Sequence, residues 1–152
     1  MNTIASFLVD HDKLTKGIWL SRVDENIHTY DIRTCVPNDG QYLEGKALHT
    51  MEHLFATYAR NSQNGDKVVY VGPMGCRTGF YLVVRNMGHR DAVQLIKDSF
   101  RFMAGYEGAI PGASRKECGN YLEHDLEGAK REAAAFLPII EHWSESDIYY
   151  RQ

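Results

Sequence analysis

The sequence lacks the features that mark several classes of protein. No apolar run approaches the roughly 20 residues that a helix needs to cross a bilayer. The N-terminus has neither the basic start nor the apolar stretch of a secretory signal. Its 17 basic residues are outnumbered by 20 acidic ones, for a net charge of −3, so the composition does not favour nucleic acid or an anionic membrane as a partner. We therefore expect a cytoplasmic protein with neither partner.

Cysteine is also scarce, and no repeat, linker or phosphate-binding glycine loop is present. The three cysteines, Cys35, Cys76 and Cys118, are widely spaced and odd in number. Without an export signal they are expected to be reduced thiols, available as ligands or reactive groups. The 152 residues, 43% of them hydrophobic, suit one domain over residues 1–152.

Hydrophobic periodicity predicts an α+β protein in two layers. Residues 1–25 mix short apolar pieces with charge and are assigned no element. Strands are expected at 26–35, 67–71 and 80–85, and helices at 45–60, 90–103 and 121–137. Asn120 is the expected N-cap of the last helix.

The expected helix 45–60 carries His49 and His53 with Glu52 directly before the second histidine. Residues i and i+4 lie on one face of a helix, so both imidazoles can reach one metal ion. The alternative without function is that the two histidines occur there by chance, with one of them packed against the core. The pattern H-x-x-E-H also occurs in inverted zincin peptidases, and the motif alone does not distinguish a peptidase from other metal chemistry.

Cys118 is the candidate third ligand. It lies in a polar segment at the expected start of the last helix, where the helix N-terminus and a metal would both favour a thiolate. Two histidines and one cysteine would leave a coordination position open, as in catalytic sites. A half-buried structural cysteine is the alternative.

Cys76 lies in a segment that contains three glycines and a proline, between two expected strands. A thiolate presented there can act as an acid or base beside a carbonyl that a metal polarises. Arg33 and Arg77 are the candidate cations to favour the thiolate. The alternative is a small residue that fits a crowded turn.

Together, residues 49–54, 72–81 and 117–120 resemble the S-ribosylhomocysteine lyase family, called LuxS. Residues 6–11 and 30–38 match as well, so the resemblance covers nearly the whole chain. It implies a mostly antiparallel sheet with flanking helices. It also implies cleavage of S-ribosylhomocysteine to homocysteine and 4,5-dihydroxy-2,3-pentanedione, the precursor of autoinducer-2, by carbonyl shifts and β-elimination.

The resemblance further implies an iron(II) cofactor, which zinc or cobalt can replace, and a homodimer with sites at its interface. It assigns roles residue by residue: metal ligands His49, His53 and Cys118, acid/base residues Glu52 and Cys76, the cation Arg33, and substrate contacts Ser6, His11 and Arg33. Two departures from the family concern binding. Residues 16–22 differ from the usual run, and Tyr70 stands where many members have an acidic residue.

Two other functions remain open from the residues. One is a small metallopeptidase of inverted-zincin type, in which Glu52 would activate water. The other is a non-enzymatic dimer or signalling protein that keeps a structural metal, which would have a closed site of four protein ligands.

Overall fold

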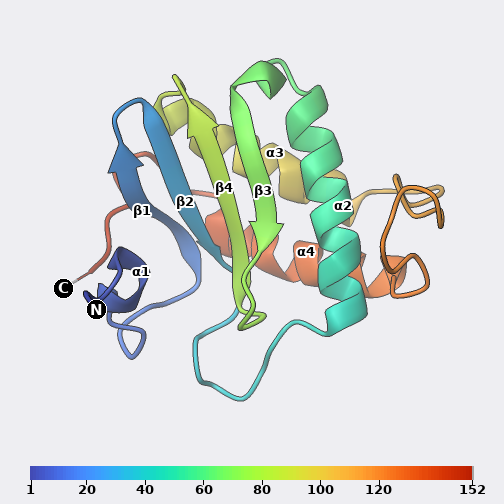
Figure 1. The fold of residues 1–152 in the computed structure, drawn as a ribbon, viewed down its shortest axis with the longest axis horizontal. Helices are drawn as coiled ribbons and strands as arrows, with labels where there is room; N and C mark the ends of the chain where they lie inside the picture. Colours follow the sequence, from blue (N-terminus) through green and yellow to red (C-terminus); the bar gives the residue numbers. More distant parts are fainter. Residues whose placement is uncertain (152) are drawn as a thin grey trace.

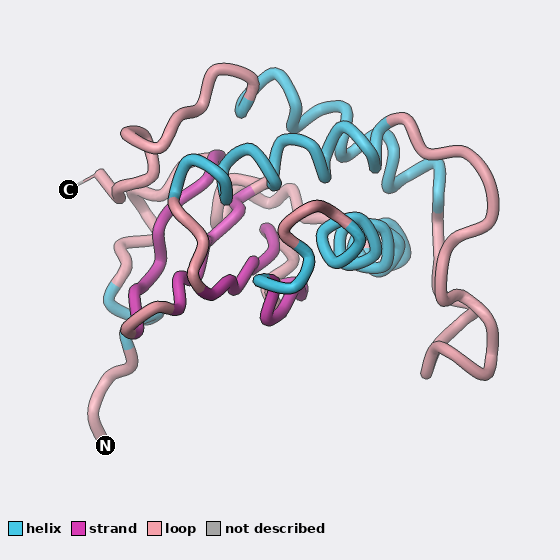
Figure 2. Tube along the Cα trace, turned by 90° about the horizontal axis from the view of Figure 1, so that it is seen from above, coloured by secondary structure: helices cyan, strands magenta, loops and turns pink. Residues whose placement is uncertain are grey.

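The computed structural model describes residues 1–151 and has a four-stranded antiparallel sheet with helices against one face (Figures 1 and 2). The strands follow the order β1-β2-β4-β3. The elements are α1 (Ala5–Leu8), β1 (Gly17–Asp24), β2 (Ile27–Arg33), α2 (Gly45–Asn61), a 3-10 turn (Gly65–Lys67), β3 (Val68–Pro73), β4 (Gly79–Arg85), α3 (His89–Ala104) and α4 (Leu126–Ile140). The prediction of a two-layer α+β fold with a mostly antiparallel sheet is confirmed.

The core lies between the sheet and the helices. Tyr30 pairs with Leu82 and Ile32 with Phe80 across β2 and β4, and all four side chains are fully buried. Alternate residues of a strand point to one face, so this register directs them all toward the helices. Phe55 of α2 packs against Phe80, with ring centroids 6.2 Å apart, and so ties the helix layer to the sheet.

Helix α2 positions the candidate metal ligands. Its N-cap Glu44 accepts hydrogen bonds from the backbone N–H groups of Lys46 and Ala47, which the first turn would otherwise leave unpaired. Met51, Leu54 and Phe55 are fully buried on its inner side. Burying this apolar stripe fixes the rotation of the helix and leaves the His49–His53 side half-buried.

Two sequence expectations differ from the structure. Residues 17–24 form a strand, β1, that was not predicted. The last helix begins at Leu126 rather than Tyr121, and its N-cap is Asp125, whose side chain accepts from the N–H of Gly128, so the prediction of Asn120 as N-cap was wrong. The long α3–α4 connection therefore continues to residue 125 and lies beside α2, opposite α1 (Figure 1).

Within residues 1–151, no helix is long and apolar enough to span a bilayer.

Candidate active site

Four side chains converge between α2 and the α3–α4 connection. The ligand atoms of His49, His53, Cys118 and His124 all lie within 4.8 Å of one another. Cys118 Sγ is 3.5 Å from His49 Nε2 and 3.8 Å from His53 Nε2. The three ligands expected from the sequence are thus brought together, and the group could hold a metal ion.

Backbone carbonyls orient the two helix histidines. His49 Nδ1 lies 2.7 Å from the carbonyl oxygen of Glu123, and His53 Nδ1 lies 2.8 Å from that of Pro111. A carbonyl can only accept, so each Nδ1 carries the proton and each Nε2 keeps its lone pair. Both Nε2 atoms face Cys118, which is the tautomer and direction that a metal ligand needs.

His124 is the member of this group that the sequence reasoning missed. Its Nε2 lies 3.9 Å from Cys118 Sγ, and its ring stacks on that of His49 at a centroid separation of 4.0 Å. Burial, together with the neighbouring His49 and His53, lowers the pKa of His124 to about 4, so the ring is neutral. The available signal was a histidine six residues after Cys118, but the helix predicted from Tyr121 concealed it.

The environment of Cys118 also differs from the expectation. The residue lies in a turn, with its N–H donating to the carbonyl oxygen of Ser114, and α4 begins eight residues later. The helix N-terminus does not stabilise its thiolate, because that effect fades within one turn. A bound metal and the imidazoles around the sulfur are the groups that can do so.

Cys76 belongs to a second cluster, in the β3–β4 turn. The residue is exposed, and its sulfur lies 3.0 Å from the Thr78 hydroxyl and 4.0 Å from Arg33 Nη1. Arg77, the other cation considered, donates instead to the Leu43 carbonyl oxygen. Arg33 is therefore the cation beside this thiol.

Arg33 is fixed by a buried ion pair. It donates to both carboxylate oxygens of Asp31, at 3.0 and 2.7 Å, and both side chains are 3% exposed. Burial lowers the pKa of Arg33, but the hydrogen bonds and charge of Asp31 raise it more, so the net change is upward. The Tyr150 hydroxyl also donates to Asp31, at 2.8 Å. A permanent positive charge is thus held next to the Cys76 sulfur.

Glu52 and Tyr70 line the same open hollow beside the metal group. This hollow, of about 490 Å³, also includes His53 and the backbone around Gly112. The Tyr70 ring lies over Gly72, where a Cβ would collide with it. Tyr70 and Glu52 thus face one hollow beside α2.

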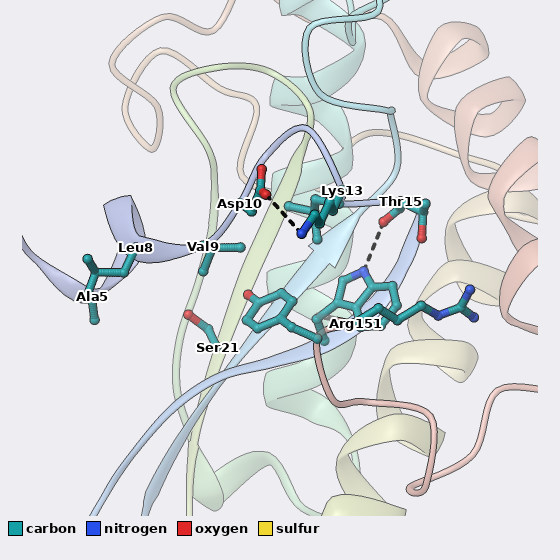
Figure 3. Close-up of a pocket in the computed structure, with 11 residues that line it drawn as sticks. Ala5, Leu8, Val9, Asp10, Lys13, Thr15, Ser21 and Arg151 are labelled. Atoms are coloured by element: carbon teal, nitrogen blue, oxygen red, sulfur yellow. Dashed lines mark hydrogen bonds and ion pairs between the residues drawn. The ribbon is translucent and has the colours of Figure 1, made fainter.

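Ser6 and His11 lie elsewhere. Ser6 is on α1, and His11 follows it, with Nδ1 2.8 Å from the Val9 carbonyl oxygen. Between them, Val9 and Asp10 line a hollow of about 290 Å³ against the β1 side of the sheet (Figure 3). Because β1 and β3 are opposite edges, this segment is separated by the sheet from the metal group on α2 (Figure 1).

The expected site residues therefore form separate groups within one chain. Among residues 1–151, no hydrogen bond connects Cys76, Ser6 or His11 with the four-residue metal group. Fold and site together define an α+β protein with a group of three histidines and one cysteine that could hold a metal ion, and with a separate thiol beside an arginine.

Comparison of the chain with known proteins assigns it to a family. The family model described as S-Ribosylhomocysteinase (LuxS) matches residues 4–147. S-ribosylhomocysteine lyases from Phocaeicola vulgatus and Borreliella afzelii are 48% and 46% identical to this chain, covering 99% of it and 98% and 99% of their own lengths. The lyase from Finegoldia magna is 43% identical, with 99% of both chains covered. The chain belongs to the LuxS family.

Proposed function

We propose that this protein is an S-ribosylhomocysteine lyase, which releases L-homocysteine and 4,5-dihydroxy-2,3-pentanedione. The observation that carries the proposal is the preorganised group of His49, His53 and Cys118, whose two imidazoles present Nε2 toward one sulfur. Membership of the LuxS family supports the same chemistry.

The reaction requires only proton transfers and one bond cleavage next to a carbonyl. When bound, a divalent metal supplies a Lewis acid that makes neighbouring C–H bonds acidic. In the final step a proton leaves the carbon next to the carbonyl, a C=C bond forms, and the C–S bond breaks to give the homocysteine thiolate. The chain must therefore provide groups that accept and return protons.

Cys76 and Glu52 are proposed as these groups. The Arg33 charge and the Thr78 hydroxyl beside the Cys76 sulfur support its reaction as a thiolate base. Glu52 lies next to His53 in the sequence and lines the open hollow beside it, a position suited to a carboxylate that moves hydroxyl and carbon-bound protons. Arg33 is proposed to hold the thiolate and contact substrate.

Iron(II) is the proposed metal, with zinc or cobalt able to occupy the group. Imidazole and thiolate ligands suit all three ions, so the ligand types do not select among them. Anaerobic purification followed by elemental analysis tests this assignment. Iron below the level of both other metals would count against it.

A homodimer with sites at its interface is also proposed. The support is that Ser6 and His11 lie beside β1, whereas the metal group lies beyond β3, and these two strands are the opposite edges of the sheet. A partner subunit could bring the N-terminal segment of one chain to the metal group of the other. The exposed apolar side chains Phe7 and Leu8, 74% and 73% accessible, are suited to such a contact.

Subunit mixing tests the shared site. Cys118→Ala subunits lack the metal, and Ser6→Ala/His11→Ala subunits lack the substrate contacts. If each site combines both subunits, random mixing gives about half mixed dimers, each with one intact site, and about a quarter of wild-type activity. Activity of the mixture no greater than the average of the two parents contradicts the shared site.

The direct test of the function is release of free thiol from S-ribosylhomocysteine by the iron(II)-loaded protein, followed with a thiol reagent. No release by fully loaded protein rules the function out. The metallopeptidase alternative is not favoured by the family assignment, and a peptide substrate in the same experiment should remain uncleaved. Two further predictions stand. Product analysis tests whether the product is used in signalling, and cell fractionation tests the location in the cytoplasm.

A further inference from the structure

The three histidines of the metal group are not held alike. His49 and His53 direct Nδ1 at carbonyl oxygens, whereas His124 directs Nδ1 at the Thr50 hydroxyl, 2.9 Å away. A carbonyl fixes the proton on Nδ1, but a hydroxyl can donate or accept. The role of His124 therefore depends on the direction of its hydrogen bond with Thr50.

The backbone of Asp125 settles that direction. Its N–H donates to Thr50 Oγ1 at 2.9 Å, so one acceptor position of the hydroxyl oxygen is already used. Thr50 is fully buried, and within residues 1–151 its hydroxyl has no hydrogen-bond partner besides Asp125 N–H and His124 Nδ1. A buried hydroxyl proton without an acceptor is costly, so Thr50 donates to Nδ1. Because Nδ1 accepts this bond it carries no proton, so the ring proton of His124 lies on Nε2.

We propose that His124 is a fixed Nε2–H hydrogen-bond donor in this site and not a third imidazole ligand of the metal. With the site free of substrate, the proton points to the Cys118 sulfur, 3.9 Å away, and stabilises the thiolate. During the lyase reaction proposed above, on which this step rests, the same N–H continues to stabilise the Cys118 thiolate. A metal held by His49, His53 and Cys118 would then keep an open position, unlike one in a closed structural site of four protein ligands.

Nitrogen NMR of the zinc-loaded protein, labelled with ¹⁵N-histidine, reads the tautomer without any turnover. We expect His49 and His53 to carry the proton on Nδ1 and His124 to carry it on Nε2, with the His124 signals assigned by their loss in His124→Gln. A proton on Nδ1 of His124, with Nε2 shifted by the metal, overturns the proposal.

Two substitutions of Thr50 test whether its hydroxyl fixes the tautomer of His124. Thr50→Ser keeps the hydroxyl and should preserve the Nε2–H tautomer, whereas Thr50→Val removes the donor and should lose it. An unchanged tautomer in Thr50→Val contradicts the role of Thr50. Should Thr50→Val fail to fold, the wild-type and Thr50→Ser spectra still decide the position of the proton.

Cobalt substitution tests the contact with sulfur. His124→Gln, which retains an N–H donor, and His124→Leu, which has none, should both bind one cobalt(II) per chain, as wild type does. The thiolate-to-cobalt charge-transfer band should move to lower energy in His124→Leu and less in His124→Gln. Loss of cobalt in both variants, or a band that does not move in either, refutes the proposal.

Turnover is a separate readout. Loss of one preorganised donor typically reduces kcat by about 10²-fold or more, so His124→Leu should lose kcat with little change in KM, and His124→Gln should recover part of it. Equal kcat in wild type and His124→Leu contradicts a part for this donor in the lyase reaction. If wild type itself releases no thiol, the lyase function fails, while the NMR and cobalt spectra still judge the tautomer.

Discussion

Substitution of Gly112 by alanine should weaken metal binding through His53. Gly112 has φ of +68°, and a Cβ there would lie 3.3 Å from His53 Nδ1, the atom that donates to the adjacent Pro111 carbonyl oxygen. An L-residue in the left-handed region costs about 1–2 kcal/mol. The new methyl group must also displace either the ring or the carbonyl that orients it.

The expected magnitude follows from these two effects. The backbone cost should lower Tm by roughly 2–8 °C for a chain of this size. Disturbing a hydrogen bond that orients a metal-ligating histidine typically reduces metal affinity by about 10–100-fold. Competition with a chromogenic zinc chelator measures the affinity, and calorimetry of the metal-free protein measures Tm.

Gly40→Ala is the matched control. Gly40 has φ of +79°, but a Cβ there would meet nothing within 4 Å. It should therefore lose stability without losing metal affinity. Wild-type affinity in Gly112→Ala, or an equal loss of affinity in both variants, would refute the proposed support of His53 by this loop.

Three further outcomes are expected. Cys118→Ala should lose bound metal, whereas Cys76→Ala should keep it and lose turnover; equal metal content in both, with full activity in Cys76→Ala, contradicts their assigned roles. Glu52→Gln should bind metal normally yet show greatly reduced thiol release, and wild-type turnover would remove Glu52 from the proton transfers. Tyr150→Phe leaves the buried Asp31 carboxylate without one donor. It should lower the free energy of unfolding, measured by chemical denaturation, by about 1.5–3 kcal/mol. An unchanged free energy of unfolding would show that this hydrogen bond adds nothing to stability.

Much of the fold follows from local pattern, because α2, α3, β2 and β4 carry apolar residues at the period of their own element. Strand β1 does not: its first three residues are all buried and its last three are all exposed, without alternation, and the strand is defined by its pairing with β2. Such pairing depends on tertiary context and leaves little local signal.

The start of α4 was misjudged for a related reason. Tyr121 and Leu122 fit a helical apolar pattern, yet they are exposed in a turn, at 36% and 72%. Asp125 caps the helix instead, and the contact of its N–H with Thr50 connects that cap with α2. A contact between residues so far apart in the sequence cannot be predicted from one segment. Because the helix was predicted to start too early, His124 was not recognised as part of the site.

The site was predictable where residue type and helical spacing determine the geometry. His49 and His53 share one face of α2 as expected, and chemical reasoning about thiol ligands identified Cys118. By contrast, the carbonyls that orient the histidines come from loops far along the chain, at Pro111 and Glu123. Their positions depend on how the α3–α4 connection packs against α2.

The most direct test of the lyase assignment is the amount of homocysteine thiol released per bound iron under anaerobic conditions. Protein loaded with one iron(II) per chain should release many equivalents of thiol from S-ribosylhomocysteine, and the metal-free protein should release none until iron is restored. Full iron occupancy with no thiol released, or equal release from loaded and metal-free protein, would contradict a metal-dependent lyase.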